Sequence, residues 1–360
     1  MKILVYGAGL IGSIVASQLK KNEYDVTILA RGQHAENLRS FGIVTHAFEG
    51  DDYCTVHPPV VESLTPEDIY DVILVIMRRN NHEEILPILS KNSHYKKVVF
   101  LGNNVGGASD IVKFVDAKKV ALGFGGTTGE RRGDVIYHYA ADEKGNFGKF
   151  WLGELDQSPS LILLELQTIL ENAGFETEIS PDIDAWLKTH AAIVLPIAFG
   201  LYLCDGDNFR LSRTRDAIVT TFRGIKEGLK VLRKLQVSIL PQKYQLFSLV
   251  PEPVAVAYLR TFFNTDFARV GLAVHANNAK DEMFYLANEF KTLITASGVD
   301  TPHLNHLFAV TDQTQEDQII LPEGSKSKPL DWKPIWIGAG ILTGILGALG
   351  FILTQQKKRK

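Results

Sequence analysis

Residues 2–12 read Lys2-Ile-Leu-Val-Tyr-Gly7-Ala-Gly9-Leu-Ile-Gly12, and this stretch decides the fold of the first half of the chain. The apolar residues before Gly7 predict a buried strand, and residues 10–19 carry apolar side chains at helical spacing. Between the two lies the pattern G-x-G-x-x-G. A strand, this turn and a helix in that order are typical of a dinucleotide-binding unit.

Each glycine of the turn has a physical role in such a unit. Gly7 permits the tight turn, Gly9 lets the backbone approach a pyrophosphate, and Gly12 lets the helix pack closely on the strand. The free amides at the helix start, those of Leu10, Ile11 and Gly12, would then face the phosphates. We therefore expect these five residues to bind a dinucleotide. The alternative is a glycine-rich turn that holds no ligand.

A second strand is expected at residues 25–29, and Arg31 follows its end. Sites that prefer NAD usually place an acidic residue here to hold the ribose hydroxyls, whereas an arginine suits the 2′-phosphate. Arg31 therefore predicts NADP(H) as the cofactor. The alternative is an arginine that is merely solvated in its loop.

Composition narrows the classes of protein. The chain has 360 residues, a net charge of −3 and charges of both signs well mixed, which gives no electrostatic footprint for nucleic acid. Cys54 and Cys204 lie far apart, as suits a reducing compartment. His303 and His306 have no acidic partner in their motif, so we expect no metal site. We expect no signal peptide, because the charged Lys2 leads straight into a strand.

The rest of the chain indicates a second, helical part. Buried strands are expected at 71–76 and 98–101, and Arg78 and Asn103 follow their carboxyl ends, where open α/β sheets bind ligands. Helical periodicity then predicts helices at 161–173, 183–197, 215–235 and 279–297. The expected fold is an α/β Rossmann domain followed by a mostly α-helical domain. The expected segments are 1–156 (NADP-binding), 161–311 (helical, for substrate and dimerisation), 312–333 (flexible tether), 334–354 (transmembrane helix) and 355–360 (basic tail).

The C-terminal segment predicts attachment to a membrane. Residues 335–353 carry no charge, and Lys333 and residues 357–360 flank them. As a helix this run would be about 28 Å long, close to the ~30 Å of a hydrocarbon core. We expect a single-pass anchor with the enzyme domains in the cytoplasm. The basic end opposes that orientation, because positive charge usually stays inside. The alternative is a glycine-rich helix buried on the soluble domains.

Several motifs, taken together, resemble the ketopantoate reductase family, the 2-dehydropantoate 2-reductases. The resemblance covers residues 1–310 and rests on Gly7-x-Gly9-x-x-Gly12, Arg31, Asn103, Gly153-Glu154, Ala185-Trp-Leu-Lys188, Asp281-Glu282 and Ala296-Ser-Gly298-Val-Asp-Thr-Pro302. It implies an NADP-binding Rossmann domain joined to a helical domain like the C-terminal domain of 6-phosphogluconate dehydrogenase. It also implies a homodimer as one possible assembly.

The resemblance implies roles for single residues. It implies that Lys188 is the catalytic lysine, that Asn103 lies on the cofactor and substrate side, and that Glu282 binds substrate. Arg78 stands where the family commonly has a lysine near the adenosine end of the cofactor. From the residues alone, Lys188 could be a lysine on a helix flank, Glu282 an acid at a helix start, and Asn103 a turn residue.

Two positions depart from the family pattern, and both lie on the substrate side. Ala192 stands where an asparagine is usual, and Val270 stands, by simple counting, where a serine is usual. Asn277 and Asn278 could supply replacement polar groups. His190, two residues beyond Lys188, should face away from it on a helix.

The leading hypothesis is an NADPH-dependent reductase of a small 2-oxo acid, with Lys188 and Glu282 as catalytic residues. A lysine with a desolvated head gives up its proton more readily, and that proton would meet the charge that forms on the carbonyl oxygen. Two alternatives remain open. One is a catalytically degenerate NADP(H)-binding sensor at a membrane, and the other is a scaffold that oligomerises through its tail.

Overall fold

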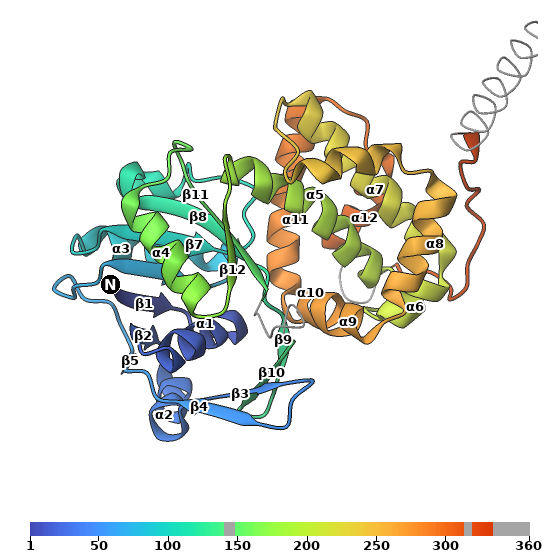
Figure 1. The fold of residues 1–360 in the computed structure, drawn as a ribbon. Coiled ribbons are helices and arrows are strands. Elements are labelled where there is room, and N and C mark those ends of the chain that lie inside the picture. The colour runs from blue at the N-terminus through green and yellow to red at the C-terminus, as the bar shows by residue number, and fades with distance from the viewer. Residues whose placement is uncertain (140–147, 313–318, 334–360) are drawn as a thin grey trace, which may run out of the picture.

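A computed structural model describes residues 1–139, 148–312 and 319–333, which form two domains side by side (Figure 1). The N-terminal domain is built on an eight-stranded sheet with the order β12-β11-β8-β7-β6-β1-β2-β5. All neighbours pair in parallel except β11 with β8. Its strands are β1 Lys2–Tyr6, β2 Asp25–Leu29, β5 Val60–Val61, β6 Val72–Val75, β7 Lys97–Leu101, β8 Val120–Gly125, β11 Lys149–Glu154 and β12 Glu176–Ile179.

The central strands are apolar throughout because both faces of the sheet are covered. Alternate residues divide between two cores. Ile3 and Val5 of β1 lie in the core beside α1 and α4, whereas Leu4 and Tyr6 lie in the core beside α3. The helices of this domain are α1 Leu10–Lys21, α2 Gly32–Phe41, α3 His82–Lys91 and α4 Leu161–Asn172, with short 3₁₀ turns η1 Arg79–Asn81, η2 Ile111–Lys113 and η3 Ala117–Lys119.

A second sheet of four strands extends from the edge of this domain, in the order β4-β3-β10-β9. Its strands are β3 Ile43–Ala47, β4 Tyr53–Val56, β9 Gly129–Arg132 and β10 Val135–His138. The sheet reaches toward the helical domain, where Glu130 of β9 pairs with Arg269 at 3.3 Å.

The boundary between the domains lies later than the sequence predicted. The linker was expected at 157–160, with α4 in the helical domain. Instead, Leu163, Leu166 and Leu170 of α4 pack in the core of the Rossmann sheet, and β12 pairs with β11. The correction has a simple cause. A helical period cannot show which core its apolar face meets, and β12 is a short strand of alternating polarity.

The helical domain begins with α5 and surrounds a single large core. Its elements are α5 Ile183–Tyr202, α6 Asn208–Arg213, α7 Arg215–Lys234, η4 Gln242–Leu249, α8 Glu252–Phe263, α9 Asp266–Ala268, the π-helical turn η5 Arg269–Val274, α10 His275–Asn278, α11 Lys280–Ser297, α12 Pro302–Phe308 and η6 Ala309–Asp312. All four helices that were expected in residues 161–297 are present, with ends shifted by up to five residues.

Helices α5 and α7 approach each other closely along this core. A Cβ added to Gly228 of α7 would lie 3.1 Å from the carbonyl oxygen of Ala192 on α5, and one added to Gly200 of α5 would lie 2.1 Å from the Thr221 hydroxyl of α7. Small residues on both helices therefore allow this separation. Within the described residues, α5 is long and apolar enough to cross a membrane, but 72% of that window is buried in the protein. It is the central helix of the core.

Residues 319–333, called the strap here, lie along the helical domain (Figure 1). The sequence predicted a flexible tether at 312–333, and the described part of it corrects that expectation. Asp216 of α7 accepts hydrogen bonds from the Ser327 amide and hydroxyl and from the Lys328 amide, at 2.7–2.8 Å. The polar groups of the strap thus form hydrogen bonds to the helical domain. The predicted transmembrane helix at 334–354 and the basic tail at 355–360 lie outside the described residues.

A buried ion pair joins β7 to β11 and provides a test of the sheet. Lys97 and Glu154 lie 2.8 Å apart, and their side chains are 3% and 5% exposed. Replacing Lys97 with Met leaves Glu154 charged and unpaired, so we expect a loss of about 3–5 kcal/mol in the free energy of unfolding. Denaturant titration measures it. Arg39→Met, which breaks the exposed pair with Glu62, is the matched control and should cost less than about 1 kcal/mol. Equal losses would contradict this account.

Candidate active site

The turn after β1 forms a cradle with room for a phosphate. Gly7 has φ +121°, and a Cβ there would lie 2.3 Å from the Ile76 carbonyl oxygen. A Cβ on Gly12 would lie 1.9 Å from the Gly7 carbonyl oxygen, so helix α1 starts in direct contact with the turn. A Cβ added to Gly9, by contrast, would have no atom within 4 Å apart from the glycine itself and its two chain neighbours. The open side of the turn is therefore at Gly9, in front of the unpaired amides that begin any helix, here those of Leu10 and Ile11.

Arg31 stands at the carboxyl end of β2 and immediately precedes helix α2. It is exposed, and within the described residues no hydrogen bond or ion pair holds its guanidinium. It lies close enough to Tyr6 at the end of β1 to act on its pKa, which burial raises and the positive charge of Arg31 partly lowers. The guanidinium is thus free to meet an anion at the ribose end of a cofactor that lies on the cradle.

The loops after β6 and β7 meet the helical domain through Arg79, which sequence analysis did not single out. Its guanidinium is 4% exposed and pairs with Asp110 at 2.8 Å and with Glu289 of α11 at 3.0 Å. Glu289 also accepts hydrogen bonds from the amides of Val105 and Gly106. One sequence signal was available, since Glu289 lies seven residues after Glu282 and so shares its helix face.

Glu282, at the start of α11, is buried between the two domains with 4% of its surface exposed. Its Oε1 accepts a hydrogen bond from the Arg79 amide at 3.0 Å, and its carboxylate also bonds to the Asn103 side chain. Burial raises the pKa of Glu282, and the Arg79 amide, the charge of Arg78 and Asn103 only partly oppose this. The structure therefore brings two predicted residues, Asn103 and Glu282, into direct contact.

Lys188 lies on the second turn of α5, with its side chain 15% exposed. Its Nζ pairs with Oδ2 of Asp184, one turn earlier on the same helix. Gly107 of the first domain lies beside it, since a Cβ added there would be 3.9 Å from that Nζ. A cavity of about 460 Å³ opens here between the loop and the helix, and its walls include Gly106, Ser109 and Glu154.

One loop therefore links the predicted residues of both domains. It begins with Asn103, which bonds to Glu282, and ends with Gly107, beside Lys188. Asn104 braces it, because its side chain accepts from the Gly107 amide and donates to the Gly107 carbonyl. Within the described residues, Lys188 and Glu282 make no direct hydrogen bond. They lie at the two ends of the loop that follows β7, at the carboxyl edge of the parallel sheet.

The other predicted residues have varied surroundings. Arg78 is half-exposed and pairs with Asp281 at 2.8 Å, and it also donates to the Asn278 carbonyl. It therefore holds the two domains together at the rim of the site. The Asn277 side chain donates to the Gly206 carbonyl at 3.0 Å. Its amide thus braces the turn after α5.

The two departures from the family pattern are both inside the helical domain. Ala192 is 1% exposed and packs against Gly228 of α7. Val270 is fully buried in the π-helical turn η5. A polar side chain at either position would need a buried partner. At Ala192 the small side chain permits the close approach of α7.

His190 lies on α5 near Lys188, and His303 lies on α12 of the helical domain. His190 faces away from Lys188, as the helix period requires, and its ring stacks on Trp186 at 5.3 Å and meets Phe124 of β8 at 4.2 Å. Burial, with a smaller effect from the charge of His275, lowers the pKa of His190 to about 4. The ring is therefore neutral at pH 7 and packs as an aromatic side chain.

His303 was expected to have no acidic partner in its motif, but the fold brings Glu227 to 2.6 Å from its ring. No cluster of metal ligands occurs among the described residues.

Together, the cradle after β1, the loops at the carboxyl edge and the helical domain beyond them define a dinucleotide-binding protein of two domains. Residues 3–156 match the family model for ketopantoate reductase PanE/ApbA. The chain is 25% identical to a 2-dehydropantoate 2-reductase of Pyrococcus horikoshii over 52% of this chain and 58% of that protein. It is 23% identical to one of Halobacterium salinarum over 66% and 77%. These comparisons show that the N-terminal domain of this chain is similar to that of the ketopantoate reductases over residues 3–156.

Solved structures agree on the fold. The 2-dehydropantoate 2-reductase of Geobacter metallireducens is 13% identical, with a TM-score of 0.71 over 87% of this chain and 99% of that one. A D-mandelate dehydrogenase solved with NADH and anilino(oxo)acetate is 18% identical, with a TM-score of 0.70 over 87% and 97%. The matched segment spans about three fifths of the first two curated relatives, 58% and 61%. The Rossmann domain and the helical domain are therefore those expected.

Burial of Glu282 predicts a dependence of stability on pH. Because its pKa is raised in the folded protein, the native state binds the proton more tightly than the unfolded chain. The stability that this gives is complete below the unfolded value of about 4.3 and is lost as pH rises through the raised folded pKa. Glu282→Gln keeps the acceptor for the Arg79 amide and removes the charge. We expect the variant to be the more stable protein at pH 7, with a difference that vanishes toward pH 4. Unfolding midpoints across this range measure it, and a constant difference would contradict the assignment.

Proposed function

We propose that this protein is an NADPH-dependent reductase of a small 2-oxo acid, similar to the 2-dehydropantoate 2-reductases, with Lys188 as the general acid. The observation that carries the proposal is the position of Lys188. It lies beside the loop that follows β7, at the carboxyl edge of the parallel sheet where dinucleotide-binding folds hold their ligands. The same loop carries Asn103 in contact with Glu282.

The residues fit the chemistry of carbonyl reduction. A bound nicotinamide supplies a hydride to the carbonyl carbon. The oxygen gains negative charge as the C=O double bond becomes a single bond, and the Lys188 ammonium neutralises it by donating a proton from Nζ. The lysine then regains a proton from water. Asp184 holds Nζ next to the cavity, and Asn103 and Glu282 are placed to bind polar groups of the substrate.

Two features support NADPH as the cofactor. The cradle leaves Gly9 open for a pyrophosphate, and Arg31 has no partner within the described residues. A free guanidinium at the end of β2 is suited to bind a 2′-phosphate through charge-assisted hydrogen bonds. Neither Ala30 nor Arg31, the two residues that follow β2, has an acidic side chain that could hold the ribose hydroxyls.

One observation favours a second candidate function, a cofactor-binding sensor without turnover. Ala192 and Val270 are buried and apolar, so the helical domain offers fewer polar groups to a substrate than the family pattern implies. The intact cradle together with this reduced substrate side fits a protein that binds NADP(H) and signals its redox state. The presence of Lys188 next to a cavity favours the reductase.

We also propose that residues 335–353 attach the protein to a membrane. Their nineteen uncharged positions support this, and the chain enters the run directly from the strap. The tail would keep the two described domains at the membrane surface, on the side where the cofactor and the acid substrate are dissolved.

A substrate panel tests the reductase. With NADPH and a series of 2-oxo acids, at least one should be reduced, as followed by the loss of NADPH absorbance. Lys188→Ala should lower kcat by ~10²–10⁴-fold and leave NADPH affinity unchanged, because only the proton donor is lost. Lys91→Ala, an exposed lysine at the end of α3, is the control. Tight NADPH binding without turnover of any compound would favour the sensor, and a near-normal kcat of Lys188→Ala would refute the acid.

Cofactor choice is tested at Arg31. Replacement with Ala should weaken NADPH binding by roughly ten- to a hundredfold, as expected for a charged hydrogen bond of about 1.5–3 kcal/mol, and should hardly change NADH binding. Arg39→Ala, on the helix that follows Arg31 and paired with Glu62, should change neither affinity. Dissociation constants from cofactor fluorescence measure both. An equal loss for the two cofactors would show that Arg31 does not hold the 2′-phosphate.

A further inference from the structure

Helix α8 has an apolar outer face. Val254, Ala257, Tyr258 and Thr261, at positions i, i+3, i+4 and i+7, all point to solvent. Val254 is 54% exposed and Tyr258 is 69% exposed. A surface helix normally carries charged residues on this side. The inner face is apolar as well, since Ala255, Val256, Leu259 and Phe263 lie in the core.

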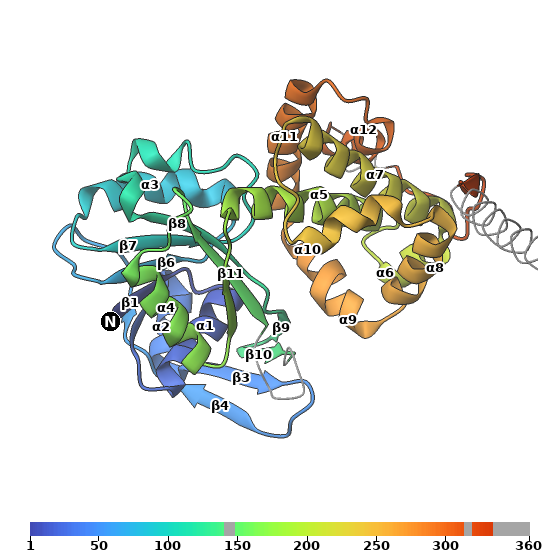
Figure 2. The same cartoon turned by 45° about the horizontal axis from the view of Figure 1, so that its top comes forward.

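The neighbouring segments extend this face. Leu246 and Leu249 of η4, just before α8, are 62% and 73% exposed, and Trp332 at the end of the strap is 49% exposed. We call Leu246, Leu249, Val254, Tyr258 and Trp332 the apolar face. In both views α8 lies at the end of the helical domain that is remote from the Rossmann sheet (Figures 1 and 2). Large apolar side chains that are exposed on neighbouring elements are typical of a docking surface.

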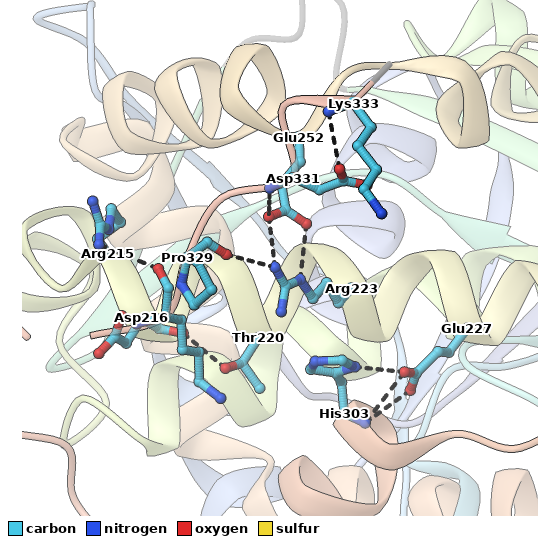
Figure 3. Close-up of polar contacts among 11 residues, drawn as sticks. Arg215, Asp216, Thr220, Arg223, Glu227, Glu252, His303, Pro329, Asp331 and Lys333 are labelled. Carbon is cyan, nitrogen blue, oxygen red and sulfur yellow. Dashed lines mark hydrogen bonds and ion pairs between the residues drawn. The ribbon is translucent and has the colours of Figure 1, made fainter. Parts of the chain in front are cut away.

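The strap is fixed to α8 just before the chain leaves the described residues. The Asp331 amide donates to Glu252 of α8 at 3.0 Å, and Arg223 of α7 bonds to both carboxylate oxygens of Glu252 and to the Pro329 carbonyl (Figure 3). Glu252 is 5% exposed, so this anchorage is buried. The end of the strap therefore has a defined place beside the apolar face.

This anchorage limits how far α8 can be from the uncharged run at 335–353. Ile335 lies four residues after Asp331, and four extended residues span at most about 14 Å. If the run enters a bilayer, the start of α8 must lie within that distance of the hydrocarbon boundary. We therefore propose that the apolar face docks on the lipid bilayer that holds the tail, in the interfacial layer. The proposal rests on the membrane attachment proposed above.

The chemistry of the face fits a bilayer surface. Trp and Tyr side chains prefer the interface between headgroups and hydrocarbon, and Leu and Val can enter the acyl boundary. Within residues 242–263 the charged residues are Lys243, Arg260 and Glu252, and the carboxylate of Glu252 is neutralised by Arg223. The exposed charges are therefore basic, as anionic headgroups require.

The same elements do not span the membrane. Together η4 and α8 are long and apolar enough for a broken span, but they turn through 119° between them. The inner side of α8 is also part of the core, and Phe247 of η4 packs on Phe222 of α7 with ring centres 5.3 Å apart. Insertion as a span would remove both from the protein. Contact through the outer face alone keeps the helical domain intact.

The test uses full-length protein in liposomes that contain anionic lipid, with single cysteines for an environment-sensitive fluorophore. Leu249→Cys and Tyr258→Cys report on the apolar face, and Phe41→Cys, 60% exposed on α2 of the other domain, is the matched control. Cys54 is replaced by Ser. Cys204 can remain, because it is fully buried and burial raises the pKa of its thiol to about 11. Spin-labelled lipids should quench positions 249 and 258 several-fold more than position 41.

The outcomes separate the face from the anchor. Carbonate extraction of the same liposomes tests the tail alone, and release of the protein would refute both the anchor and the docking face. Retention with equal, weak quenching at positions 41, 249 and 258 would refute the face and leave the anchor. The fluorophores at positions 249 and 258 could instead report an apolar environment that increases with the amount of protein per liposome, without quenching by spin-labelled lipid. That result would mean that a second copy covers the face, and it would also refute the proposal. Turnover with NADPH is measured separately and bears only on the reductase.

Discussion

The buried guanidinium of Arg79 is the interaction on which the geometry of the site depends. A cation that is 4% exposed is costly unless charged partners compensate it, and here Asp110 comes from the first domain and Glu289 from the second. The backbone amide of the same residue bonds to Glu282. Arg79 follows β6, and its partner Glu289 on α11 also accepts hydrogen bonds from the loop after β7. The conformation of the carboxyl edge of the sheet therefore depends on contact between the two domains. The cofactor edge and the substrate side are thus one folded unit.

Helix α5 provides the second link between the domains. Ile183, Trp186 and Leu187 pack in a core of the Rossmann domain, whereas Leu195 and Phe199 belong to the core of the helical domain. Lys188 lies where the two cores meet. Its backbone is fixed from both sides, and its ammonium is held by Asp184. A proton donor needs such positioning more than it needs an unusual sequence, because the effect of general acid catalysis falls quickly when the geometry is lost.

Much of the fold followed from local patterns. The strand, glycine turn and helix at the N-terminus, the buried strands and the long amphipathic helices are encoded by residues near one another in the chain, and the family comparisons support the same architecture. The place of α4 and β12 was mispredicted, since their partners are distant in sequence. The strap was mispredicted for the same reason. Its polar residues are typical of a flexible tether. In the structure, however, its backbone amides donate hydrogen bonds to Asp216 and Glu252, which lie about eighty to a hundred and ten residues earlier in the chain.

For the site, the sequence by itself determined which residue types were available: the glycines of the cradle, Arg31, Asn103, Lys188 and Glu282. Only the tertiary structure decided which of them meet. It joined Asn103 to Glu282, gave Lys188 its partner Asp184, used Asn277 to brace a turn and made Arg79 the link between the domains. The reason is physical. Periodicity and turn chemistry act over a few residues, whereas a buried charge or amide must find its partner wherever the chain brings one, and that choice is made by packing.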